Sequence, residues 1–302
     1  MCILFILVGS CIEPELRPTI IASNRDEYFT RATNLGTVSI QHDSQGVSVY
    51  RYLPTDLEDG GSWLGFDVPT DTKDNLSSFR FAVVLNFHSW RSELLESGTH
   101  VMQKAAAPDL LLSRGMLVKN YLTNGLSAKE YAESLASSIN RYRPFNLIVG
   151  DASEVYFLAT HQPQPILLRK GFLYGLTNGH QLLEYNSGDI GAFCGWEKLH
   201  RGCRLVDQKI LPFLPLVEEM ARSEKLWHLR YMARTVCEEV LNDSTPLPDA
   251  SFGSESAAAC QLAAIFVKPL GNLFLPSQGP AELTHWKRVV IKIVLRRKDR
   301  RS

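Results

Sequence analysis

The chain opens on an unbroken apolar run, and this feature constrains the fold more than any other. Residues Cys2–Val8 carry no charged side chain. A run of this kind is typical of a strand that is buried on both faces. A second short run, Thr19–Ala22, follows a polar turn through Pro14–Pro18. Two such runs joined by a short loop predict a hairpin, so we expect both segments to lie side by side inside the protein.

The opening run differs from a signal peptide. It has no basic region in front of it, and it is interrupted by Gly9-Ser10 and then by Glu13 and Glu15. The sequence contains no run of the roughly 18 consecutive apolar residues that a transmembrane helix needs. We therefore expect neither a secretory leader nor a membrane span.

The remaining pattern alternates between groups of strands and pairs of helices. Ser127-x-x-Glu130 is a capping-box pattern that begins one helix, and Pro108-Asp109 begins the helix before it. Two later helices are predicted over Trp196–Leu211 and Ser223–Leu241. The predicted strands are Gly46–Tyr52, Ser62–Phe66, Phe79–Phe87, Asn146–Val149, Val155–Ala159, Ile166–Leu168, Phe172–Gly175 and Leu262–Val267, with a loop over Ser251–Ala259. This order favours an α+β layered sandwich, in which two packed sheets are flanked by helices.

Charge is distributed unevenly between the bulk of the chain and its C-terminal end. Lys+Arg and Asp+Glu both total 32, and this neutrality argues against nucleic acid as the main partner. Residues Thr284–Ser302 nevertheless contain eight Lys or Arg and one Asp, a net charge of +7. We expect one domain over residues 1–268 and a divergent basic tail over 269–302. The tail is either a solvated extension or a peripheral contact with an anionic membrane surface or an RNA.

Cysteines and histidines give no metal-binding pattern. The six cysteines are scattered and form no C-x-x-C pair, which is typical of reduced thiols in an intracellular protein. The eight histidines show no H-E-x-x-H spacing. We therefore expect no metal site and no cofactor.

Cys2 is the first candidate for chemistry. Removal of Met1 would give a chain that begins with a thiol and its own α-amine, and such an amine titrates near pH ~7.7–8.0. One residue would then supply both nucleophile and base.

The stretch Thr19–Glu27 places Arg25, Asp26 and Glu27 at the end of the neighbouring strand. A carboxylate there could hold the amine, and Arg25 could lower the thiol pKa or bind an anionic substrate. The alternative is a polar turn with local ion pairs.

An ordered series of short motifs runs through residues 1–268. It consists of Met1-Cys2-Ile3, Ile21–Arg31 with Asn24-Arg25-Asp26-Glu27, Gly60-Gly61-Ser62-Trp63-Leu64-Gly65, Leu85-Asn86-Phe87, Ser113-Arg114-Gly115, Pro144–Asp151, Tyr174–Asn178, Trp196-x-Lys198 and Leu247-Pro248-Asp249. This series resembles the NRDE family, the group that includes Transport and Golgi Organisation protein 2. After Lys268-Pro269 the chain departs from the family pattern, in which a Gly-Thr-Arg-type segment and one more strand follow.

The family in turn resembles N-terminal-nucleophile hydrolases of the cholylglycine hydrolase type, and this implies roles for individual residues. Cys2 matches the nucleophile, and Asp26 matches the aspartate that orients its amine. Asn86 and Asn178 are candidate amide donors to an oxyanion. In those hydrolases an arginine lies three residues before the aspartate, whereas here Arg25 directly precedes Asp26. Trp63 is either core or the wall of a substrate pocket, with Gly60-Gly61 as the turn before it.

Two functions follow as expectations. The first is a role in secretory transport and Golgi organisation, or in haem or acyl-lipid handling, on a hydrolase-like fold without turnover. The second is a cysteine amidase or acyl transferase that uses Cys2. The expected partner is a small molecule, either an amide, an acyl thioester or haem. The expected location is the cytoplasm, with association with the Golgi or mitochondria as an alternative.

Overall fold

The computed structural model describes residues 2–9, 19–28, 31–34, 38–70, 79–87, 111–179, 182–185, 197–213, 258–267 and 291–292. These residues fall into two compact units. The first unit comprises residues 1–31, 170–177 and 181–302, and the second comprises residues 32–169 and 178–180.

The first unit is built on a six-stranded sheet with β1 (Ile3–Leu7) near its centre. β1 pairs antiparallel with β2 (Thr19–Tyr28) on one side and with β12 (Leu173–Thr177) on the other. The sheet order is β13-β12-β1-β2-β14-β15. Its other strands are β13 (Leu182–Tyr185), β14 (Ala258–Val267) and β15 (Ile291–Lys292). The predicted hairpin of the two opening runs is therefore confirmed.

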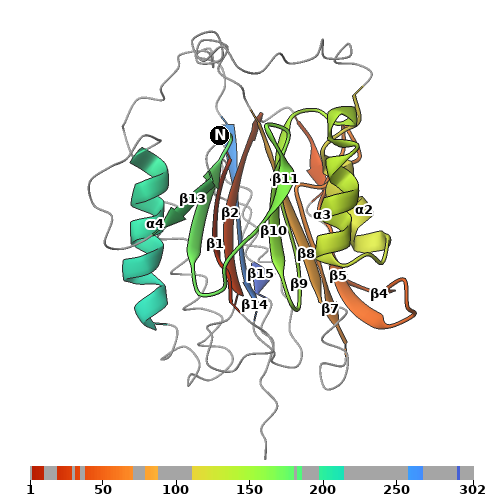
Figure 1. The fold of residues 1–302 in the computed structure, drawn as a ribbon, viewed down its shortest axis with the longest axis horizontal. Coiled ribbons are helices and arrows are strands. Elements are labelled where there is room, and N and C mark those ends of the chain that lie inside the picture. Colours follow the sequence, from red (N-terminus) through yellow and green to blue (C-terminus); the bar gives the residue numbers. More distant parts are fainter. Residues whose placement is uncertain are drawn as a thin grey trace, which may run out of the picture. The chain divides into compact units, whose positions relative to one another are not determined.

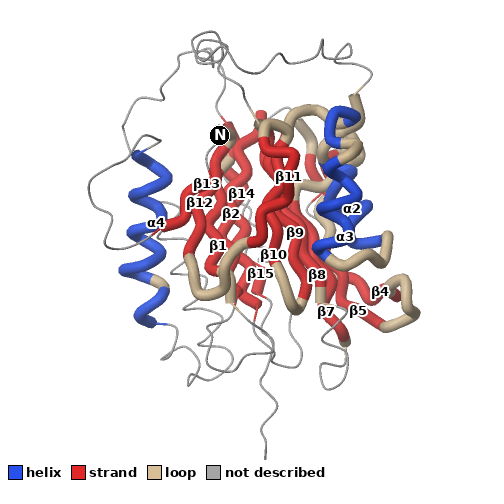
Figure 2. The backbone as a smooth tube through the Cα atoms, viewed as in Figure 1, coloured by secondary structure: helices blue, strands red, loops and turns tan. Residues whose placement is uncertain are grey.

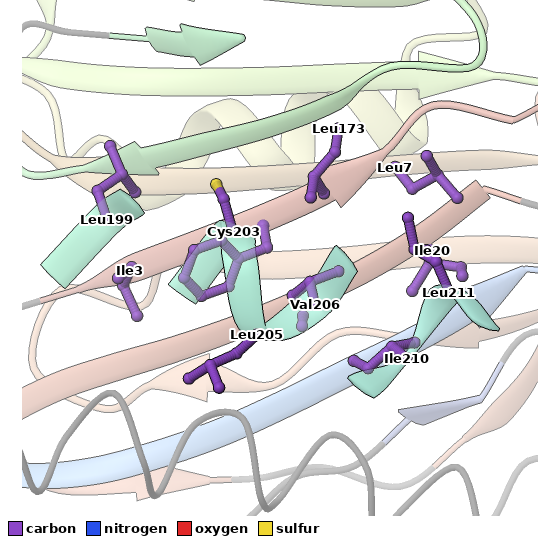
Figure 3. Packing of buried hydrophobic residues seen from close by; sticks show 12 residues of the cluster. Ile3, Leu7, Ile20, Leu173, Leu199, Cys203, Leu205, Val206, Ile210 and Leu211 are labelled. Atoms are coloured by element: carbon purple, nitrogen blue, oxygen red, sulfur yellow. The ribbon is translucent and has the colours of Figure 1, made fainter. Parts of the chain in front are cut away.

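Helix α4 (Glu197–Lys209) covers one face of this sheet. It packs against β1, β12 and β13, and Figure 1 shows it alongside these strands. The buried cluster beneath it takes alternate residues from β1, because successive side chains of a strand point to opposite faces. Figure 3 shows Cys203 among apolar side chains of the sheet and the helix. The cluster consists of Ile3, Phe5, Leu7, Ile20, Ala22, Leu173, Leu199, Cys203, Leu205, Val206, Ile210 and Leu211.

The intervening residues of β1, Leu4 and Ile6, lie on the face that turns away from α4. Both are almost wholly buried, as is Ile21, which is paired with Ile6. β1 is thus buried on both faces, as its unbroken apolar sequence predicts.

The second unit is built on a seven-stranded antiparallel sheet. The strand order is β11-β10-β9-β8-β7-β5-β4. The strands are β4 (Ser39–His42), β5 (Ser48–Tyr52), β7 (Leu64–Pro69), β8 (Arg80–Asn86), β9 (Phe145–Asp151), β10 (Val155–Ala159) and β11 (Gln162–Leu167). A separate two-stranded sheet pairs β3 (Thr33–Asn34) with β6 (Thr55–Asp56). Within this unit α2 packs on β7 and β8, and α3 packs on β9, β10 and β11 (Figure 2).

Helices α2 (Gly115–Thr123) and α3 (Ala128–Ala136) adjoin in sequence. The predicted capping box of α3 is confirmed, because the Ser127 hydroxyl accepts a hydrogen bond from the Glu130 amide and the Glu130 carboxylate accepts one from the Ser127 amide. These hydrogen bonds from Ser127 lower the pKa of Glu130. Short 3-10 turns follow at Ile139–Arg141 and, after α4, at Leu211–Phe213.

The α+β class is confirmed, with several sheets and few helices among the described residues. Several boundaries differ from the predictions. β2 continues six residues beyond Ala22 to Tyr28, and β14 begins at Ala258, inside the segment that was expected to be a loop. The helix predicted to begin at Pro108-Asp109 begins only at Gly115, because Leu112 is held in an isolated bridge with Tyr142. β11 begins at Gln162, four residues before the predicted start at Ile166. The predicted helix Ser223–Leu241 lies outside the described residues. The packing of two sheets on each other and the division into a domain over 1–268 and a tail over 269–302 stay predictions.

No helix among the described residues combines the length and the apolar character that crossing a membrane would require.

Replacing Tyr52 by phenylalanine is expected to raise the free energy of unfolding by about 1 kcal/mol, because a buried hydroxyl without a partner destabilises the folded state. The Tyr52 side chain is wholly buried and stacks on Phe66, and its hydroxyl has no hydrogen-bond partner among the described residues. Tyr121→Phe is the control, since the Tyr121 hydroxyl donates to the Gly150 carbonyl at 3.0 Å and its removal should cost stability. Urea denaturation measures both. A loss of stability in Tyr52→Phe would contradict the prediction.

Candidate functional site

Cys2 lies directly before the central strand of the first unit. Its side chain is buried, with 8% of its surface exposed, and it forms no disulfide. The next residue, Ile3, pairs with Asn24 on β2 and with Thr177 on β12. The backbone directly after Cys2 is therefore held from both sides by strand pairing.

Arg25 follows Asn24 on β2, at the point where the paired register of β1 and β2 ends with Ile3 and Asn24. Continued by one position, the same antiparallel register would set Cys2 opposite Arg25, and residues directly opposite each other share one face of a sheet. Ile3 belongs to the face under α4, and Arg25, which follows the strand partner of Ile3, belongs to the face that turns away from the helix. The Arg25 side chain is 7% exposed.

This arrangement has a chemical consequence. A guanidinium group stays charged at all ordinary pH values and presents five N–H donors in a plane. Placed beside a thiol, it favours the thiolate, which is the nucleophilic form. It can equally bind the carboxylate or phosphate of a ligand with two parallel hydrogen bonds. Burial of Arg25 would strengthen either interaction, since a buried charge interacts more strongly than an exposed one.

Asp26 lies one residue beyond Arg25 on β2, where its backbone is paired in register with Cys260 of β14. Its side chain lies outside the described residues. The role expected for it, holding the α-amine of Cys2, therefore stays a prediction.

The structure brings Asn86 and Asn178 together in the second unit. Asn178 Nδ2 donates a hydrogen bond of 2.6 Å to the backbone carbonyl of Asn86, at the end of β8. The Asn178 side chain is almost wholly buried. Donation to an oxyanion by either asparagine stays a prediction.

Asn146 is a further polar residue of this region that was not expected. It lies on β9, is completely buried, and donates from Nδ2 to the Gly179 carbonyl at 2.7 Å. Its only signal in the sequence is its place in the Pro144–Asp151 motif. The same motif contains Pro144, whose carbonyl accepts hydrogen bonds from Arg114 Nη1 and from the Phe87 amide.

Trp63 is buried within the second unit, and its carbonyl accepts a hydrogen bond from the Val84 amide at 2.8 Å. The segment before it makes a close backbone contact, because the Ser62 amide donates to the Gly115 carbonyl at 3.0 Å. Two motifs of the sequence, Gly60–Gly65 and Ser113-Arg114-Gly115, thus meet in space. A role for Trp63 in substrate binding stays a prediction.

A buried ion pair also lies in the second unit. Arg51 Nε and Nη2 donate to the two carboxylate oxygens of Asp67 at 2.7 and 2.6 Å, and Nη2 also donates to the Leu122 carbonyl at the end of α2. Burial raises the pKa of Asp67, while the hydrogen bonds from Arg51 oppose that rise. Arg80 lies over the ring of Tyr121 and donates to the Leu126 carbonyl. These contacts join α2 to the sheet and give the pair a structural role.

Among the described residues there is no group of three or more His, Cys, Asp or Glu side chains that could hold a metal ion. The prediction that the protein uses no metal or cofactor stays a prediction.

These features define an α+β protein with largely antiparallel sheets, a buried cysteine directly before a central strand and a buried arginine on the neighbouring strand. The chain belongs to the Transport and Golgi organisation 2 family, whose model matches residues 1–282. That match confirms the resemblance of the sequence motifs and extends it beyond residue 268.

Three relatives are similar over much of the chain. The mouse Transport and Golgi organization 2 homolog and its human counterpart are each 26% identical over 239 residues, which cover 76% of this chain and 67% of theirs. The Transport and Golgi organization protein 2 of Drosophila melanogaster is 28% identical over 190 residues, which cover 59% of this chain and 58% of that protein. The matched region thus spans about two thirds or less of each relative.

Proposed function

We propose that this protein binds acyl compounds, either acyl lipids or acyl thioesters, through Cys2 and Arg25, in support of secretory transport and Golgi organisation. The printed names of the three relatives motivate the cellular part of the proposal. The chemical part is supported by one observation: Cys2 and Arg25 are both buried and each adjoins one member of the Ile3–Asn24 pair, so the register of β1 and β2 would set them opposite each other if it continued by one position.

The pair suits an acyl ligand for two reasons. A fatty carboxylate or the phosphate of a carrier thioester would be bound by the Arg25 guanidinium through charge-assisted hydrogen bonds. The Cys2 thiolate could then attack a thioester carbonyl. In that step the bond between Cys2 Sγ and the acyl carbon forms, the bond from the acyl carbon to the carrier sulfur breaks, and the carrier leaves as its thiolate. The step needs no further reactant.

Replacing Arg25 by methionine is expected to weaken acyl-CoA binding about 10- to 100-fold, because a hydrogen bond to a charged group is worth about 1.5–3 kcal/mol. Calorimetric titration of the full chain with a long-chain acyl-CoA and, separately, with haem measures this effect. Cys203→Ala is the matched control, since Cys203 is also buried in the first unit but faces the apolar core under α4. It should bind like the wild type.

Three outcomes of this titration count against the acyl proposal. Absence of saturable binding to acyl-CoA and to haem would remove ligand handling altogether. Saturable binding of haem alone would replace the acyl ligand by haem. Unchanged acyl-CoA binding in a folded Arg25→Met variant would place the ligand elsewhere in the protein.

A second candidate is turnover by an N-terminal-nucleophile mechanism. The observation in its favour is that Cys2 directly precedes the central β1, where sheet pairing on both sides orders its backbone. The mechanism requires Cys2 to be the mature amino terminus, with an amine that titrates near pH ~7.7–8.0 as its base. Intact-mass measurement of the protein from its native source tests this requirement. Retention of Met1 would rule out the self-base mechanism and leave the binding proposal unaffected.

A further inference from the structure

Ser23 is a buried polar residue of the first unit that lies on β2, two positions before Arg25. Ile20 and Ala22 of the same strand belong to the cluster under α4, where Figure 3 shows Ile20. Successive side chains of a strand point to opposite faces of the sheet, so Ser23 lies on the face that turns away from the helix. Arg25 lies on the same face by the same alternation.

The neighbours of Ser23 on this face of β1, β2 and β12 are apolar, apart from Arg25. Ser23 pairs with Leu4 of β1, and Leu4 pairs with Leu176 of β12. Ile21 precedes Ser23 by two positions on β2. These three apolar side chains are almost wholly buried, and Ser23 itself is 5% exposed.

The hydroxyl of Ser23 forms no hydrogen bond with another residue in the part of the chain that the structure describes. A buried hydroxyl without a partner destabilises the folded protein, and most buried polar groups therefore have one. The hydroxyl is thus a donor whose partner the described residues do not supply, on the face that carries the Arg25 guanidinium.

The spacing of Ser23 and Arg25 suits a shared ligand group. A strand rises about 3.4 Å per residue, so two residues on the same face are about 7 Å apart along it. The serine hydroxyl donates one hydrogen bond and the long arginine side chain presents five N–H donors. A carboxylate or a phosphate has enough acceptor oxygens to take hydrogen bonds from both.

We infer that Ser23 is a ligand-binding residue, whose hydroxyl donates to the same carboxylate or phosphate that Arg25 binds. The inference rests on the proposed function, in which Arg25 holds the charged end of an acyl ligand. The hydroxyl gains its partner when the ligand binds, whereas the free protein contains it as a buried donor without one. Its removal should therefore weaken ligand binding without lowering the stability of the free protein.

Ser23→Ala is expected to weaken binding of the anionic ligand about tenfold, because one hydrogen bond to a charged group is lost. The midpoint of its urea denaturation without ligand should equal or exceed that of the wild type. Calorimetric titration of the full chain with a long-chain acyl-CoA and with the free fatty acid measures the affinity. A loss for acyl-CoA assigns the phosphates as the bound group, and a loss for the fatty acid assigns the carboxylate.

Thr19→Val is the matched control. Thr19 lies on the same face of the same strand and is 4% exposed, but its hydroxyl accepts a hydrogen bond from the Gly9 amide at 3.0 Å. It is six positions from Arg25, which is about 20 Å along a strand. This variant should have a lower midpoint of urea denaturation, and its affinity for either ligand should stay within about twofold of the wild type.

A double variant tests whether Ser23 and Arg25 hold the same group. In an Arg25→Met background, Ser23→Ala should weaken binding less than about twofold further, because residues that share one partner do not act additively. A full tenfold loss in that background would overturn the shared contact.

The single variants give outcomes that separate the inference from the proposed function. Unchanged affinity of Ser23→Ala for both ligands, with saturable binding by the wild type, would overturn the inference alone. An equal loss of affinity in Thr19→Val, or a lower urea midpoint in Ser23→Ala, would also overturn it. Absence of saturable binding of either ligand by the wild type would overturn the proposed function and the inference together.

Discussion

Replacing Arg51 by methionine is expected to lower the free energy of unfolding by about 3–5 kcal/mol, one of the largest effects of any single substitution in the protein. Asp67 is completely buried and receives both of its strong hydrogen bonds from Arg51. Removing the guanidinium leaves a carboxylate in a place where water cannot reach it. The Leu122 carbonyl at the end of α2 loses a donor at the same time.

The loss of unfolding free energy in Arg51→Met should depend on pH. Burial already raises the pKa of Asp67, and Arg51 is the main influence that lowers it. Without Arg51 the folded-state pKa rises further above the unfolded value of about 3.9. The folded variant then binds more protons than the unfolded chain, so its stability falls as pH rises through the folded-state pKa. The stability deficit relative to the wild type should shrink as the pH is lowered from 7 towards 4.

Arg143→Met is the matched control for this experiment. Arg143 pairs with Asp59 at 3.0 Å, but both side chains are partly exposed. An exposed pair contributes about 0–1 kcal/mol, so this variant should change little. Urea denaturation at pH 7 and at pH 4.5 separates the two variants. Equal stability losses, or a loss in Arg51→Met that grows as the pH falls, would contradict the role assigned to the buried pair.

Replacing Gly61 by alanine is expected to lower the free energy of unfolding by about 3 kcal/mol, at the upper end of the usual cost of overpacking. A Cβ at this position would lie 2.7 Å from Gly115 Cα and 2.9 Å from Gly115 C. Both of these are backbone atoms, so no side-chain rotation can relieve the contact. The hydrogen bond from the Ser62 amide to the Gly115 carbonyl would be broken as the segments separate.

The neighbouring residue provides the control, because Gly60 is constrained for a different reason. Its φ is +67°, and a Cβ there would meet nothing within 4 Å. Asparagine tolerates this left-handed conformation better than other residues that carry a Cβ. Gly60→Asn should therefore lose less than about 1 kcal/mol, and thermal or urea unfolding distinguishes it from Gly61→Ala. A Gly61→Ala variant as stable as Gly60→Asn would show that the two motifs can separate without cost.

Local sequence patterns predicted those strands and helices whose signals lie within a few neighbouring residues. The unbroken apolar run became β1, and Ser127 with Glu130 formed the capping box, because both signals act within a few residues. The strands that were missed are short or polar. β4 (Ser39–His42) has largely exposed side chains, and β3 and β6 contain two residues each, so neither alternation nor an apolar run marks them.

The arrangement of the candidate site could not be predicted in the same way, because it results from pairing between residues that are far apart in the sequence. The motif Asn24-Arg25-Asp26-Glu27 pointed to Asp26, whereas the pairing of Ile3 with Asn24 makes Arg25 the residue that would lie opposite Cys2 if the register continued. No spacing in the sequence specifies that pairing. The bond from Asn146 to Gly179 joins residues 33 positions apart and could not be found from local patterns.

We propose that the Cys2 thiol accepts an acyl group, and peptide mapping by mass spectrometry after incubation of the full chain with a long-chain acyl thioester decides this. We expect one acyl group on Cys2, lost in Cys2→Ala and retained in Cys203→Ala. An unmodified Cys2 under conditions in which other cysteines of the folded protein are acylated would overturn the proposal.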